Sequence, residues 1–122
     1  MSKVIQVINT MISNSNKITD VVKGSTDQEE YFFLYDNNYR WSILESVEEA
    51  ELYYIAYIYP KTKLSVLNLA SALSFTGEES FVPYSSKDLK SQEALESFRE
   101  LFNVVKSKLL GVDDIFSKIL DE

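Results

Sequence analysis

The chain has 122 residues, of which 45% are hydrophobic and 25% are charged, proportions typical of a single globular domain over residues 1–122. It contains no Cys and no His, which excludes disulfides, thiolate nucleophiles, imidazole bases and most transition-metal sites. The 19 acidic residues outnumber the 12 basic ones, and the net charge of -7 disfavours binding to nucleic acids and anionic membrane surfaces.

The sequence offers no segment that is apolar enough to span a bilayer. The longest nearly apolar run, Leu52 to Tyr59, contains four tyrosines and is far shorter than the ~20 residues that a spanning helix needs. The first residues interrupt their apolar positions with amides and lack a small-residue cleavage site, so we expect no signal peptide. A cytoplasmic location is the default expectation.

The first predicted element is an amphipathic helix over Lys3 to Lys23. Apolar residues recur in this segment at steps of three or four, which is the spacing of one helical face. The run from Ser13 to Asn16 is its weak point, because Ser and Asn side chains compete with the helical backbone for hydrogen bonds, so the helix can break there. Gly24 ends it, and Ser25 to Glu30 form a polar linker.

From Tyr31 the period changes to two, which predicts a β-hairpin. Its strands, Tyr31–Asp36 and Tyr39–Leu44, are joined by a two-residue turn at Asn37 and Asn38. One face of this hairpin, the expected core face, carries Phe32, Leu34, Trp41 and Ile43, and the other carries Phe33, Tyr35, Arg40 and Ser42.

The middle of the chain predicts further strands. Leu52–Tyr59 is rich in aromatic and branched residues and is best interpreted as a central strand. Leu64–Leu69 is predicted as a fourth strand, whereas Ala70–Glu79 has no clear pattern. Ser80–Tyr84 is a short fifth strand, which we place at an edge because Pro83 cannot donate a ladder hydrogen bond.

The clearest periodicity lies near the C-terminus and predicts a long helix that begins at Ser91 and is stopped by Gly111. Its apolar stripe is Leu95, Phe98, Phe102, Val105 and Leu109. A short final helix follows, with apolar residues at Val112, Ile115, Phe116, Ile119 and Leu120. Together the elements predict an α+β fold, a single antiparallel sheet of four to five strands packed on one face by the N-terminal helix and the long C-terminal helix.

Clusters of carboxylates are the only candidates for general acid–base catalysis in the sequence. They fall in predicted loops, on the polar face of a helix or at helix starts, where solvated and capping roles are typical. We therefore assign no catalytic, metal-binding or cofactor-binding residue, and the sequence favours a protein that is not an enzyme.

The tyrosines are the more informative set, because Tyr and Arg are enriched in binding hot spots. If the helices cover one face of the sheet, its other face keeps aromatic side chains partly exposed. We assign partner binding to that face, with six residues: Tyr31, Tyr35, Arg40, Tyr53, Tyr57 and Tyr59. The alternative interpretation is that these tyrosines only cover the back of the sheet, with their hydroxyls in water.

The function that follows is a protein-interaction or self-associating module, which binds a protein partner or forms a homodimer through the tyrosine-rich face. Its size and acidity are those of small inhibitor or immunity-type proteins, an analogy of character and not of sequence. The alternative is a small-ligand-binding protein, or an enzyme based on carboxylates and tyrosines, with a pocket between sheet and helices.

We predict negligible affinity for nucleic acid at physiological salt. The excess negative charge opposes the counterion release that drives such binding, and the lysines are scattered along the chain. Fluorescence anisotropy with labelled duplex DNA and single-stranded RNA tests this expectation, and salt-sensitive micromolar binding to either would contradict it.

Overall fold

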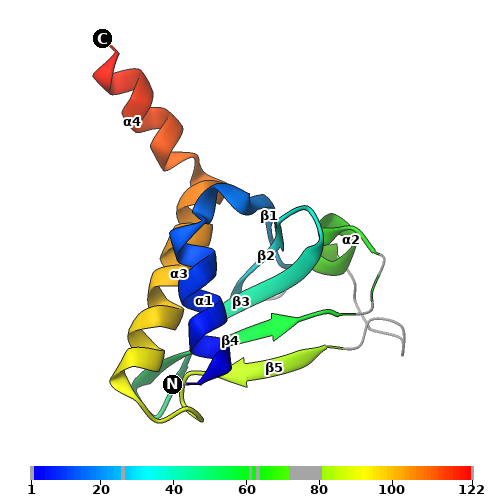
Figure 1. Cartoon of the computed structure of the whole chain (residues 1–122), viewed down its shortest axis with the longest axis vertical. Helices are drawn as coiled ribbons and strands as arrows, with labels where there is room; N and C mark the ends of the chain where they lie inside the picture. The colour runs from blue at the N-terminus through cyan, green and yellow to red at the C-terminus, as the bar shows by residue number, and fades with distance from the viewer. Residues whose placement is uncertain (1, 26, 61, 63, 72–80, 122) are drawn as a thin grey trace.

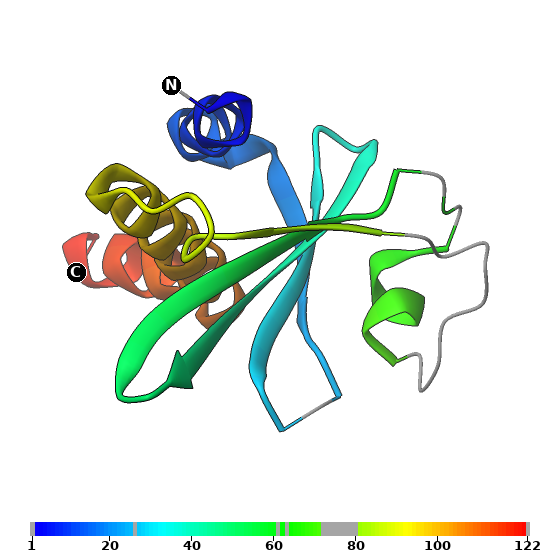
Figure 2. The same cartoon turned by 90° about the horizontal axis from the view of Figure 1, so that it is seen from below.

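A five-stranded antiparallel sheet organises the chain, in a computed structural model that describes residues 2–25, 27–60, 62, 64–71 and 81–121. The strands lie in chain order, each paired antiparallel with the next. In chain order the elements are α1 (Lys3–Ser13), the 3-10 turn η1 (Ser15–Lys17), β1 (Ile18–Lys23), β2 (Glu29–Tyr35), β3 (Tyr39–Glu48), β4 (Glu51–Ile58), α2 (Val66–Ser71), β5 (Val82–Ser85), α3 (Gln92–Leu110) and α4 (Val112–Leu120). Helices α1 and α3 lie side by side on one face of the sheet and α2 on the other (Figures 1 and 2), which confirms the predicted α+β class.

The N-terminal helix is shorter than predicted. It ends at Ser13, inside the Ser/Asn run, where the backbone N–H and side-chain amide of Asn14 both donate to the Thr10 carbonyl oxygen. The chain then enters strand β1, so the prediction of helix as far as Lys23 is wrong. The branched residues of β1 suit an edge strand, and they pack on both faces of the sheet, Ile18 towards the helices and Val22 towards α2.

The hairpin forms where it was predicted, but its register differs by one residue. Phe33 pairs with Trp41 across a three-residue turn, in which Asp36 and Asn37 have φ of +55° and +56°. Because side chains alternate along a strand, this slip moves the residues of the first predicted strand to the opposite face, whereas Trp41 and Ile43 keep the expected core face. The helix-facing side carries Tyr31, Phe33, Trp41 and Ile43, and the opposite side carries Phe32, Leu34, Arg40 and Ser42.

Helix α3 anchors the main core, as its periodicity predicted. The Ser91 hydroxyl caps its start by accepting the Ala94 N–H, and Gly111 ends it in the left-handed conformation with φ of +68°. Phe102 lies between two sheet tyrosines, with ring centroids 5.4 Å from both Tyr31 and Tyr54. The core stripe is Ala94, Phe98, Leu101, Phe102 and Val105, while Leu95 is half-buried and Leu109 is exposed.

The fourth predicted strand is a helix, so the assignment of Leu64–Leu69 as a strand is wrong. Val66, Leu69 and Ala70 follow helical spacing and pack on Phe32 and Tyr59 of the sheet. The Ser65 hydroxyl accepts the N–H of Asn68, as at a helix N-cap. Six residues contain too few turns for this period to be distinguished from alternation.

The predicted edge strand is present as β5, where Pro83 lies opposite Tyr57. The linker is also shorter than predicted, since β2 already begins at Glu29. Most of the segment that lacked a sequence pattern lies outside the described residues.

Phe102→Ala is expected to reduce the free energy of unfolding by about 3–5 kcal/mol, because Phe102 is fully buried between the sheet tyrosines. The matched control is Leu67→Ala in α2, where the side chain is 63% exposed and a change of about 0.5 kcal/mol or less is expected. Urea unfolding of both variants measures the difference. Equal losses at the two positions would contradict the packing described for α3.

Candidate interaction surfaces

The six residues assigned to one binding face are divided between the two faces of the sheet. Tyr31 is buried beside Phe102, and Tyr35 packs on the helix-side core. Arg40 and Tyr57 lie on the opposite face, with Ser42 and Phe32. The prediction of a single open surface is therefore wrong in its geometry, because the hairpin register moved Tyr31 and Tyr35 to the helix side. Their role in partner binding stays a prediction.

Beneath α2, the sheet face opposite α1 and α3 is largely covered. Tyr59 is only 4% exposed and stacks on Phe32, with ring centroids 6.0 Å apart. The Arg40 guanidinium donates to the backbone oxygens of Leu64 and Asn38. The Arg40 hydrogen bond to Leu64 holds the segment that leads into α2 against the sheet. Both Tyr59 and Arg40 therefore already make contacts that stabilise the fold.

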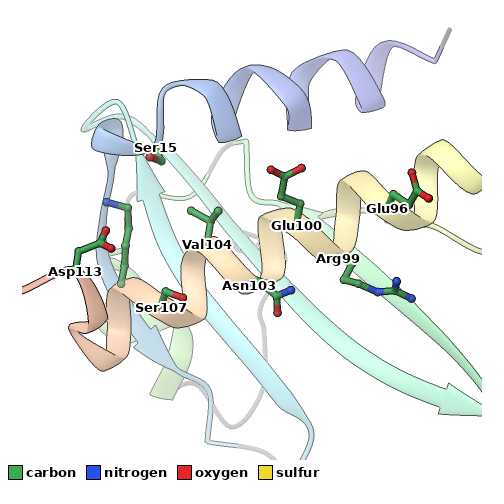
Figure 3. Close-up of a pocket in the computed structure, with 9 residues that line it drawn as sticks. Ser15, Glu96, Arg99, Glu100, Asn103, Val104, Ser107 and Asp113 are labelled. Atoms are coloured by element: carbon green, nitrogen blue, oxygen red, sulfur yellow. The ribbon is translucent and has the colours of Figure 1, made fainter. Parts of the chain in front are cut away.

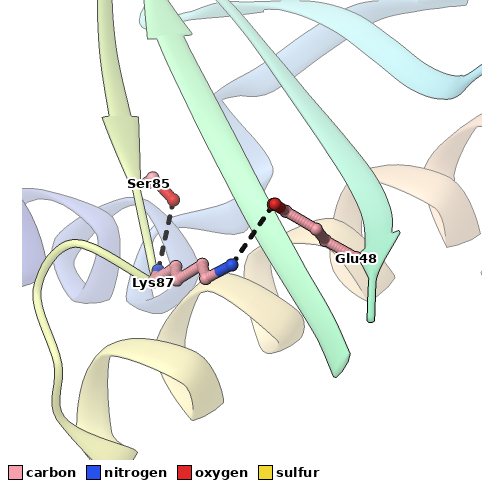
Figure 4. A network of polar contacts seen from close by, with 3 residues as sticks. All are labelled: Glu48, Ser85 and Lys87. Carbon is pink, nitrogen blue, oxygen red and sulfur yellow. Dashed lines mark hydrogen bonds and ion pairs between the residues drawn. The ribbon is translucent and has the colours of Figure 1, made fainter. Parts of the chain in front are cut away.

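Tyr53 and Tyr57 lie towards β5 on the same face. The Lys87 ammonium lies 5.5 Å from the Tyr53 ring centroid and 3.2 Å from a carboxylate oxygen of Glu48, while the Lys87 backbone N–H donates to the Ser85 hydroxyl (Figure 4). Tyr57 meets Phe81 edge to face, with centroids 5.2 Å apart. Both tyrosines are half-buried by contacts within the chain.

Glu30, which sequence analysis placed in the linker, belongs to a polar cluster inside the α2-side layer. The Ser42 hydroxyl donates to the Glu30 carboxylate at 2.8 Å and lies 3.0 Å from the Tyr59 hydroxyl. Burial raises the pKa of Glu30, and the hydrogen bond from Ser42 lowers it in part. Burial also raises the pKa of Tyr59. The linked carboxyl and hydroxyl groups satisfy one another, which explains how they are accommodated next to apolar side chains.

Helix α4 presents an apolar face to solvent. It projects from the end of α3 away from the sheet (Figure 1), and none of its residues is buried. Ile115, Phe116 and Ile119 are 51%, 57% and 56% exposed, and Leu120 is 84% exposed. The sequence predicts this stripe, but it contains no local signal that shows whether another element covers the stripe.

A second apolar surface is a groove of about 440 Å³ between α1 and the hairpin end of the sheet. Buried Met11 and Trp41 lie in it, and more exposed Val7 and Tyr39 also line it. Its full lining is Lys3, Gln6, Val7, Thr10, Met11, Tyr35, Tyr39, Trp41 and Ile58. Lys3 is the only charged residue in this set, so the groove suits an apolar occupant better than an acid–base reaction.

A polar groove of about 440 Å³ runs along the outer side of α3. Glu96, Arg99, Glu100 and Asn103 line it, but Figure 3 shows Arg99 and Asn103 on the opposite side of the helix from Glu100. Because these side chains diverge, they do not form a convergent binding site. Across the part of the chain that the structure describes, no cluster of three or more acidic side chains is placed to hold a metal ion.

Comparison of the chain with protein-family models, curated proteins and solved structures gave no match. None of the helices in the described ranges combines the length and apolar character needed to cross a membrane.

Glu30→Gln is expected to stabilise the protein near neutral pH. Because the folded pKa of Glu30 is raised, the folded protein holds this proton to higher pH than the unfolded chain, and stability is lost as pH rises through the carboxyl titration range. Gln cannot ionise but can still accept the Ser42 hydrogen bond. Urea unfolding at about pH 4 and about pH 8 should show a larger advantage of the Gln variant at the higher pH.

The control is Glu29→Gln, since the neighbouring Glu29 carboxylate is instead paired with the Lys106 ammonium at 3.0 Å. This variant is expected to gain no stability as pH rises. A Glu30→Gln variant that is less stable than the original chain at about pH 8 would be inconsistent with the burial described for this carboxyl.

Proposed function

We propose that the protein is a non-enzymatic interaction module that binds another protein chain through the apolar face of α4. The single observation that carries this proposal is the exposure of the α4 stripe, with Phe116 and Ile119 more than half open to solvent. The proposed function is the one predicted from the sequence, but the proposed binding element is the C-terminal helix and not the set of tyrosines.

The energetics of the helix support this proposal. A nine-residue helix is marginal in water without tertiary packing, and α4 contributes no buried residue to the fold. The neighbouring Leu110 at the end of α3 is 60% exposed and extends the apolar surface. A contiguous patch of this kind is uncommon on a monomer and usually marks an interface.

The charges on α4 favour a protein over a membrane as the partner. Helices that bind anionic bilayers carry Lys and Arg on their polar face. The polar positions of α4 are instead mainly acidic, with Asp113 and Asp114 in the first turn, Asp121 at the C-cap and Lys118 as the basic residue of the last turn. The net charge of the whole chain is also negative.

The test is sedimentation velocity on the chain alone and after mixing with extract of its source cells. We expect a species larger than the 14.0 kDa monomer in at least one of these conditions. The double variant Phe116→Gln/Ile119→Gln should return it to the monomer, because Gln keeps helix propensity but removes the apolar anchors. The matched control Lys118→Gln, on the same helix, should leave the complex intact.

Two results would overturn the proposal. One is a wild-type chain that sediments as the monomer in both conditions. The other is a double variant that associates as strongly as the wild type while its circular dichroism shows an unchanged fold.

A further inference from the structure

We propose that the groove between α1 and the sheet is the binding site for α4 of a second copy of this chain. This inference rests on the proposed function, since it takes α4 as the binding element, and it adds the partner and the receiving surface. In the resulting homodimer each copy would place its α4 in the groove of the other.

The two surfaces are both apolar and partly exposed. The α4 stripe has its apolar residues at helical spacing over two turns, which is the pattern of a helix that docks in a groove. The groove has a buried floor at Met11 and Trp41 and a more exposed wall at Val7 and Tyr39. No residue of α3 lines the groove, which lies on the other side of α1. An incoming helix would therefore extend the layer formed by α1 and α3.

The same chain cannot fill its own groove in this conformation. Gly111 alone separates α3 from α4, and α4 points away from the sheet (Figure 1). The apolar helix and the apolar groove are therefore complementary surfaces that one copy cannot bring together. In a dimer, the groove of each copy would receive the α4 helix of the other copy.

The charges are complementary as well. Helix α1 contains no acidic residue, and Lys3 lies in the groove lining. Helix α4 carries Asp113 and Asp114 against the single Lys118. Pairing α4 with the groove thus places a mainly acidic helix beside Lys3 and an α1 helix without acidic residues.

Reciprocal exchange also provides the symmetry of a closed dimer. Two helices in two grooves bury four apolar surfaces, twice as many as a single helix in a single groove. A two-fold exchange satisfies both copies at once and stops at two chains, as a closed interface does.

Disulfide trapping tests the proposal directly, because the chain has no native cysteine. Val7→Cys in the groove and Phe116→Cys in α4 replace residues that are 38% and 57% exposed, so both variants are expected to fold. Mixed and mildly oxidised, the two variants should give a covalent dimer that contains one copy of each. The control Val47→Cys, at a residue that is 64% exposed in β3, should not pair with Phe116→Cys.

The double variant Val7→Cys/Phe116→Cys should give dimers and no larger species. Three outcomes overturn the inference: disulfides between two copies of Phe116→Cys in preference to the mixed pair, equal pairing with Val47→Cys, or a ladder of covalent oligomers from the double variant. A chain that is monomeric alone but forms an α4-dependent complex in source-cell extract would overturn this inference and leave the proposed function standing.

Discussion

The pairing of β2 with β3 is the constraint on which the rest of the structure depends, and the turn Asp36–Asn38 sets it. Asp36 and Asn37 adopt positive φ, and the Asp36 N–H donates to the Lys17 carbonyl oxygen at 2.9 Å. This bond ties the end of the hairpin to the residue that precedes β1. Because side chains alternate along both strands, one turn decides which residues meet α1 and α3 and which meet α2.

Elements that are specified by local signals were predictable, and those that depend on distant partners were not. Helix α3 has a cap at Ser91, a glycine stop and an apolar period that runs over several turns. The hairpin register carried no such signal, because a turn of two or three residues fits the same Asp and Asn run, and the face that becomes buried depends on packing in the helix-side core. The valines of β1 likewise fit a helix as well as a strand until β2 is present to pair with them.

The candidate site was predictable in part for the same reason. Periodicity identified the apolar stripe of α4, but whether Phe116 meets another element depends on where α4 points. The tyrosines failed as a single surface because their grouping relied on a register that shifted by one residue. Glu30 was missed because an acidic residue beside a strand is usually solvated, and only the neighbouring Ser42 and Tyr59 make its surroundings unusual.

Gly111 separates the part of the C-terminal apolar stripe that is buried in the domain from the part that is exposed to solvent. Apart from the adjoining backbone and chain neighbours, no described heavy atom lies within 4 Å of where a Cβ would stand at this position, so the glycine serves the left-handed backbone and not a close approach. Phe102, Val105, Leu109, Val112, Phe116 and Ile119 follow one heptad-like spacing across it. Without this bend, α3 and α4 would form one rod roughly 40 Å long with a continuous seam. The glycine splits that seam, leaving one half inside the domain and turning the other half outward.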